Sequence, residues 1–179
     1  MFVELHARSA FSFLEGAALP ETLAERAAAP EQPALALLDR DGLYGAPRFY
    51  RAATRVGINP LVGAEVTLAE GGRLPLLVES PEGYQNLCRL ITTMKMRASK
   101  PDGAATLEEV EEYAAGLVCL TGSGDGPLAL ALETSGAAAA RARLDRLVGA
   151  FGRGNVFVEL QRRLRRAEEA RNEWLRGEA

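Results

Sequence analysis

The sequence is poor in histidine, cysteine and long apolar runs. Its 179 residues include one histidine, two cysteines and one tryptophan. No apolar window reaches the roughly 18 residues that a membrane-spanning helix needs. Residues 1–6 place no basic region before an apolar run, so no secretory signal peptide is visible. We expect a cytoplasmic protein in which Cys88 and Cys119 are reduced core thiols.

Charge and glycine content also limit the function. The net charge is -3, which argues against this segment alone being a strong nucleic-acid binder. Residues 122–126, Gly-Ser-Gly-Asp-Gly, have the composition of a phosphate loop but lack the lysine and spacing of a Walker motif. Hydrophobic residues make up 47% of the chain, enough for a sizeable core. The length indicates one domain or a piece of one.

Residues 34–45 are the most informative stretch. Five apolar residues run without alternation up to Asp39, which is typical of a strand buried on both faces of a parallel sheet. Three charged residues follow, and Gly42 and Gly45 allow a tight turn before a helical pattern begins. Carboxylates therefore stand where a buried strand ends, the position at which parallel α/β folds place their chemistry.

Strand and helix patterns alternate along the whole chain. Predicted strands cover residues 2–6, 34–38, 61–68, 74–78, 117–120 and 156–160. Predicted helices cover residues 20–29, 49–56, 80–91, 106–115, 127–132, 137–151 and 167–176, with Ser80 and Thr106 as N-caps. Right-handed crossovers then favour one mostly parallel, curved sheet with the helices outside.

Polar residues at the predicted strand ends are the candidates for chemistry. They are His6, Arg8, Asp39, Arg40, Asp41, Glu65, Glu159 and Arg163. Carboxylates and a histidine that converge from separate strands would make a metal site. Arginine cannot join such a site, because it stays protonated and offers no lone pair. A structural histidine and ordinary loop carboxylates remain the alternative interpretation.

Five motifs in this order resemble one family. They are VELHARSAFSFLEG at 3–16, DRDGLYG at 39–45, GAE at 63–65, GYQNLCRL at 83–90 and VFVELQ at 156–161. Together they resemble the polymerase-and-histidinol-phosphatase (PHP) domain that opens bacterial C-family DNA polymerases, the DNA polymerase III alpha subunit and especially its error-prone relatives. The resemblance implies a distorted (β/α)7 TIM-like barrel, incomplete in this chain. Residues 1–179 would then be the N-terminal portion of the domain, without polymerase palm, fingers or thumb.

The departures from the family pattern concern its histidines. Arg8 stands where an active member has a second histidine, Arg40 where the second motif has one, and Arg163 where a later one is expected. The resemblance implies a site that binds up to three metals in active members. In this chain we expect no bound metal, and the alternative is Zn²⁺ or Mn²⁺ at the site. His6, Asp39 and Glu65 are the matched ligand positions that remain, and these three could not hold that cluster.

The resemblance implies a DNA polymerase that extends DNA from deoxynucleoside triphosphates with Mg²⁺, in replication and damage tolerance. This segment would be a non-catalytic scaffold that packs on the polymerase body. The alternatives are a metal-dependent PHP phosphoesterase or 3′–5′ exonuclease, and an interaction module for replication or lesion-bypass factors. For the site itself we expect Arg8 and Arg40 to replace metal by charge, bridging Asp39 and Glu65, with Asp41, Glu159 and Arg163 lining it.

Overall fold

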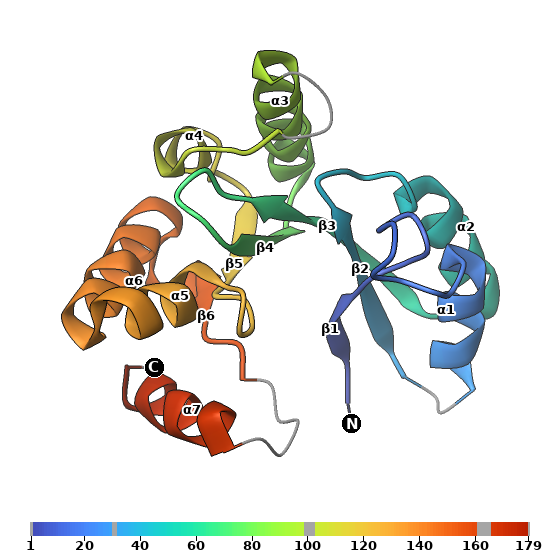
Figure 1. The fold of residues 1–179 in the computed structure, drawn as a ribbon. Coiled ribbons are helices and arrows are strands. Elements are labelled where there is room, and N and C mark those ends of the chain that lie inside the picture. Colours follow the sequence, from blue (N-terminus) through green and yellow to red (C-terminus); the bar gives the residue numbers. More distant parts are fainter. Residues whose placement is uncertain (1, 30–31, 99–102, 161–165, 179) are drawn as a thin grey trace.

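The computed structural model describes residues 2–29, 32–98, 103–160 and 166–178. In this part of the chain the strands form one six-stranded sheet in the order β1-β2-β3-β4-β5-β6. Their bounds are β1 Glu4–Ala7, β2 Ala34–Arg40, β3 Asn59–Thr67, β4 Arg73–Val78, β5 Leu117–Leu120 and β6 Val156–Phe157. The sheet curls on itself, with its outer edges β1 and β6 on the two sides of the curl (Figure 1). This arrangement confirms the predicted mixed α/β fold of an incomplete barrel.

One strand runs against the others. β1, β2 and β3 pair in parallel, and so do β5 and β6, whereas β4 is antiparallel to both of its neighbours. Gly71 and Gly72, both with positive φ, make a hairpin turn that reverses the chain between β3 and β4. The first residue of β4 therefore lies at the same end of the sheet as the carboxyl ends of β2 and β3. The predicted last strand, residues 156–160, is shorter than expected, because β6 ends at Phe157.

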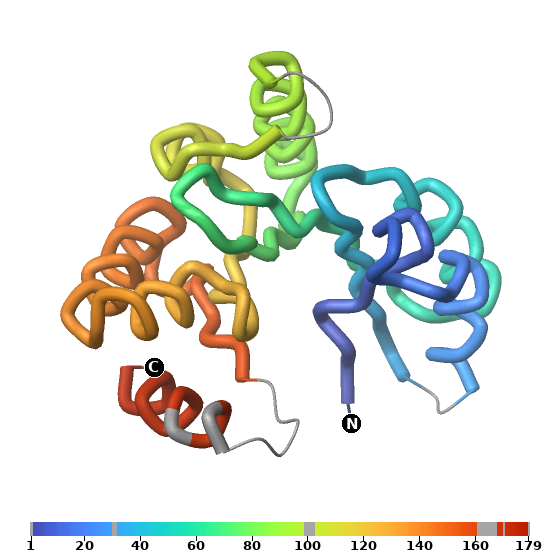
Figure 2. The backbone as a smooth tube through the Cα atoms, viewed as in Figure 1, coloured from blue at the N-terminus to red at the C-terminus, as the bar shows by residue number. Residues whose placement is uncertain are grey.

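The helices lie around the outside of the curl, except the last one, which lies apart from the sheet near β6, as Figures 1 and 2 show. They are α1 Pro20–Ala28, α2 Ala46–Val56, α3 Pro81–Arg97, α4 Leu107–Glu112, α5 Pro127–Ser135, α6 Ala137–Phe151 and α7 Arg166–Glu178, with a 3₁₀ turn at Arg153–Asn155. Both predicted N-caps are confirmed: the Ser80 hydroxyl accepts a hydrogen bond from the Gly83 amide, and Thr106 and Glu109 form a capping box. No described helix is long and apolar enough to cross a membrane.

Each strand divides its side chains between the two faces of the sheet. On β2, Leu35 and Leu37 point outward and pack with Phe49 of α2, which is fully buried. Ala36 and Leu38 point into the curl, where they meet Leu77, Leu120 and other inner-facing residues. Because strand side chains alternate with a period of two, Asp39 continues the outer face of β2 and Arg40 continues the inner face. This alternation decides which polar residues enter the site.

Candidate functional site

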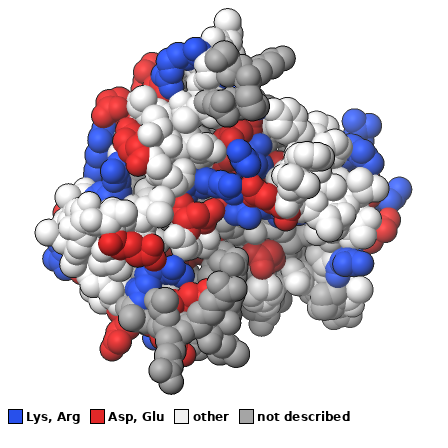
Figure 3. All heavy atoms as spheres, in the orientation of Figure 1, with Lys and Arg blue, Asp and Glu red and all other residues white. Residues whose placement is uncertain are grey.

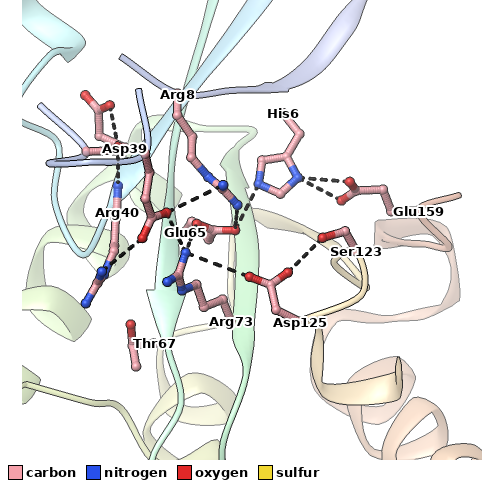
Figure 4. A network of polar contacts seen from close by, with 12 residues as sticks. His6, Arg8, Asp39, Arg40, Glu65, Thr67, Arg73, Ser123, Asp125 and Glu159 are labelled. Atoms are coloured by element: carbon pink, nitrogen blue, oxygen red, sulfur yellow. Dashed lines mark hydrogen bonds and ion pairs between the residues drawn. The ribbon is translucent and has the colours of Figure 1, made fainter. Parts of the chain in front are cut away.

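The candidate site lies inside the curl, at the end where β1, β2 and β3 finish and β4 begins (Figure 4). His6 and Arg8 come from β1 and the residues after it, Arg40 and Glu65 from β2 and β3, and Arg73 from the start of β4. Arg40 and Glu65 are register partners on neighbouring strands. Acidic and basic side chains are interspersed over the centre of this face in the space-filling view (Figure 3). The site is therefore a lattice of opposite charges.

His6 is held by carboxylates on both sides of its ring. Its Nδ1 lies 2.9 Å from Glu159 Oε2, and its Nε2 lies 3.2 Å from Glu65 Oε1. Burial opposes the charged ring, but the hydrogen bonds to Glu159 and Glu65 outweigh that effect and raise the pKa of His6 to about 9. The ring is therefore protonated at neutral pH, with both nitrogens acting as donors. Since Glu159 follows β6, this contact ties the two edges of the sheet together.

Glu65 is the most deeply buried acid of the lattice, with 1% of its side chain exposed. Its Oε1 accepts a hydrogen bond from Arg8, and its Oε2 lies 3.5 Å from Arg73 Nη1. Burial alone would raise the pKa of this carboxyl, but the hydrogen bonds from His6 and Arg8 lower it below its ordinary value. Glu65 is consequently ionised and is matched by cationic groups from three directions.

Glu15 is a second point of convergence, and it comes from the loop after β1. Its carboxylate lies 2.6 Å from Arg73 Nη1, 3.0 Å from Arg40 Nη1 and 3.5 Å from Arg8 Nη1. Burial disfavours the charge, yet the hydrogen bonds from Arg73 and Arg40 lower the pKa of Glu15. Three guanidinium groups thus share one carboxylate. Arg73 also lies 3.8 Å from Asp125, which accepts a hydrogen bond from the Ser123 hydroxyl.

Asp39 is buried, but it lies on the outer face of β2, away from this lattice. Its carboxylate accepts hydrogen bonds from the backbone amides of Ser9 and Gly45 and from the hydroxyls of Ser9 and Ser12, at 2.8–3.1 Å. These donors satisfy the carboxylate without a cation. Asp39 therefore fixes the loop after β1 and the turn before α2.

Arg8 and Arg40, the two arginines expected to replace metal by charge, differ in their contacts. Arg8 meets Glu65, as expected, whereas Arg40 binds Glu15 and lies 3.4 Å from Asp41. Among the described residues, no contact joins the guanidinium of Arg40 to the carboxylate of Asp39. Asp41 also contacts β3: its carboxylate accepts hydrogen bonds from the backbone amide and the hydroxyl of Thr67. The predicted lining residue Arg163 lies outside the described residues.

Sequence reasoning missed Glu15, Arg73 and Asp125. The predicted mostly parallel sheet excludes Arg73 from the site, because a strand parallel to its neighbours would place its first residue at the far end of the sheet. The signal was present in the short Gly71-Gly72 link, which is too short for a crossover and requires an antiparallel pair. Glu15 and Asp125 lie in loops, where no periodicity indicates the direction of a side chain.

The residues that the resemblance assigns to metal ligation are engaged by other protein groups in this structure. Both ring nitrogens of His6 already meet carboxylates, Nδ1 at 2.9 Å from Glu159 and Nε2 at 3.2 Å from Glu65. Glu65 is bound by Arg8 and His6, and Asp39 faces the other side of its strand. Within the described ranges, no group of three or more His, Cys, Asp or Glu side chains could hold a metal. The lattice neutralises its own carboxylates with guanidinium and imidazolium groups.

A cavity of about 580 Å³ lies beside the His6–Glu159 contact, between the edges β1 and β6. Its lining is largely apolar and includes Phe2, Leu5, Phe157 and Leu160, which are substantially exposed. The described parts of β1 and β6 are not paired with each other, so both edges carry free backbone donors and acceptors. We call the gap between the edges β1 and β6 the seam; it is the open side of the curled sheet.

Comparison with known proteins places the chain among polymerase relatives. Residues 4–163 match the family described as the PHP domain. The chain is 38% identical over 183 residues to the error-prone DNA polymerase of Mycolicibacterium paratuberculosis, covering 96% of this chain and 17% of that protein. It is 40% identical over 166 residues to the error-prone DNA polymerase of Corynebacterium efficiens, covering 91% and 14%. The chain thus spans less than a fifth of the length of these relatives.

Among solved structures, a protein of Bifidobacterium adolescentis described as a candidate metal-dependent phosphoesterase is also similar. It is 21% identical with a TM-score of 0.45, and the match covers 83% of this chain and 50% of that protein.

Proposed function

This chain belongs to the PHP domain family and is homologous to part of error-prone DNA polymerases, and on that premise we propose that it is the non-catalytic PHP scaffold of such a polymerase. The observation that carries the proposal is the charge lattice around Glu65. Where hydrolysis would need two or more metals to activate water, this lattice presents a protonated His6 and the guanidinium groups of Arg8 and Arg73.

The ion pairs of the lattice connect strands and a loop that are far apart in the sequence, as a structural scaffold requires. Through His6 and Glu159 it joins the β1 edge to the segment after β6, and through Arg73 it joins β4 to Glu65 on β3. Through Glu15 it also holds the loop after β1 against β2 and β4. Ion pairs between buried partners fix geometry even where they add little net stability. The domain thereby keeps a defined shape at the site without a bound metal.

The activity of the whole protein follows from its relatives and belongs to the proposal. The longer polymerase would bind DNA and deoxynucleoside triphosphates and use Mg²⁺ at palm carboxylates outside this chain, in the cytoplasm. The PHP domain would contribute by packing on the polymerase body in the same chain and by offering a surface to replication or lesion-bypass factors. The phosphoesterase and 3′–5′ exonuclease readings would instead require Zn²⁺ or Mn²⁺ at His6, Asp39 and Glu65.

Elemental analysis and thermal melts of the purified chain test the proposal. We expect less than stoichiometric zinc and manganese, and a melting temperature that does not change when a chelator is added. Added Mn²⁺ or Zn²⁺ should give no hydrolysis of a phosphomonoester or of a 3′-terminal nucleotide. Stoichiometric metal, together with a melting temperature that collapses in chelator, would show a working metal site and overturn the scaffold assignment.

A further inference from the structure

The loop after β1 carries two adjacent apolar side chains that lie almost fully in water. Phe13 is 81% exposed and Leu14 is 90% exposed. Singly exposed apolar residues are common on proteins, but two neighbours at one turn form a projecting apolar tip. We use the term apolar tip for these two residues.

The apolar tip is held rigidly by what lies beneath it. The amides of Glu15 and Gly16 both donate to the carbonyl of Ser12, at 2.9 and 3.0 Å. The Ser12 hydroxyl in turn donates to the buried Asp39 and accepts from the Arg40 amide. At Gly16 a Cβ atom would lie 1.9 Å from the Ser9 carbonyl oxygen, so the turn closes tightly on its own start. These contacts constrain the backbone of the turn that carries the tip.

The backbone at Leu14 is strained. Its φ is 64°, in the left-handed region that glycine adopts freely and that a branched aliphatic residue rarely occupies. An exposed side chain there gains nothing from packing within this chain, so the strain is not offset by burial. A leucine in that position has a physical use if its side chain contacts another surface. The next residue, Glu15, is the carboxylate that three arginines share, which fixes the strained turn in place.

We propose that Phe13 and Leu14 dock into an apolar pocket of the polymerase body of the longer protein. This rests on the proposed function, because the matched relatives carry more than four-fifths of their length outside the region shared with this chain. A preformed tip of an aromatic and an aliphatic residue is the type of anchor that fills a pocket at low ordering cost. The charge lattice would then serve binding as well as stability, since it holds the tip in its docking conformation.

Hydroxyl-radical footprinting of the isolated chain and of the longer polymerase tests the docking. Phe13 and Leu14 should oxidise at least about tenfold more slowly in the longer protein. Met96, which is 82% exposed on α3, is the internal control for solvent access. Equal oxidation of the tip in both proteins would overturn the proposal. Protection that appears in the isolated chain as its concentration rises would assign the tip to a second copy, and would also overturn it.

Substitutions provide an independent measurement. In the longer polymerase, F13S/L14S should increase the rate at which trypsin separates the domain from the body by roughly tenfold, while M96S leaves that rate unchanged. In the isolated chain, both variants should melt as the parent does, and L14G should melt higher because it relieves the strained φ. A separation rate unaffected by F13S/L14S would overturn the docking alone. A coding region without a polymerase body would instead remove the proposed function on which the docking rests.

Discussion

Replacing Arg8 by methionine tests whether the lattice takes the place of a metal. Methionine keeps most of the aliphatic length of the side chain, so the change mainly removes the guanidinium. Glu65 then remains ionised, 1% exposed and without its closest cation. Breaking a buried ion pair by removing one partner costs about 3–5 kcal/mol. His6 at 3.2 Å and Arg73 at 3.5 Å still face Glu65, so we expect the lower end, about 3 kcal/mol.

The matched control is Arg40→Met on the neighbouring strand. Arg40 is 45% exposed and pairs with Glu15 and Asp41 at the rim of the lattice. Such a pair is worth about 0–1 kcal/mol. At roughly 2–4 °C per kcal/mol for a domain of this size, R8M should lower the melting temperature by about 6–12 °C and R40M by less than about 4 °C.

Acid titration gives the second readout for Arg8. Glu65 has a lowered pKa in the folded state, so its pairing stabilises the protein above the ordinary carboxyl range and is lost as the pH falls through the folded value. The stability difference between R8M and the parent should therefore shrink in acid. Urea melts at several pH values measure this difference. Equal losses for R8M and R40M, or a penalty that is independent of acid, would refute the buried-pair argument.

Three further predictions follow from single contacts. Because the pKa of His6 is raised to about 9, its ion pairs stabilise the fold fully below pH 6.5, and this stabilisation is lost as the pH rises through about 9. The free energy of unfolding should fall by up to about 3 kcal/mol over this range, and urea melts of His6→Gln should lack this pH dependence. Gly83→Ala should unfold the start of α3, since its Cβ would lie 1.7 Å from the Gly116 carbonyl oxygen, whereas Gly149→Ala on α6 meets nothing and should raise the melting temperature through about 0.5–1 kcal/mol of helix propensity. The unpaired edges β1 and β6 should make the isolated chain associate as its concentration rises, and sedimentation should show less association for Phe157→Ser; equal association of parent and variant would show that these edges are not the contact.

The fold was largely predictable because its signals are local. The uninterrupted apolar run of β2 indicated a strand buried on both faces, and the caps at Ser80 and Thr106 indicated helix starts that the structure confirms. The exception is β4. A regular strand–helix alternation suggested crossovers throughout, but the Gly71-Gly72 turn leaves no room for one.

The site was less predictable because membership in it depends on the face of a strand. Asp39 and Arg40 are adjacent in the sequence, yet alternation sends Asp39 to the serine hydroxyls outside the sheet and Arg40 into the curl. A search for polar residues at strand ends therefore selects both Asp39 and Arg40, although only Arg40 lies in the site. Direction can be assigned from the sequence by extending the strand period: Leu35 and Leu37 share a face with Asp39, while Ala36 and Leu38 share one with Arg40.

The same geometry explains why Arg8 and Arg40 are not equivalent. Arg8 extends past β1 across the inside of the curl, where Glu65 lies without access to water, so its charge is required there. Arg40 stands at the last position of β2, where nearly half of its side chain is in solvent and water can replace its partners. We expect a guanidinium to take the place of a metal's charge only where the carboxylate that it meets is buried. By this criterion we assign that role to Arg8 and Arg73, which both face Glu65, whereas Arg40 pairs with Glu15, the residue that follows the apolar tip.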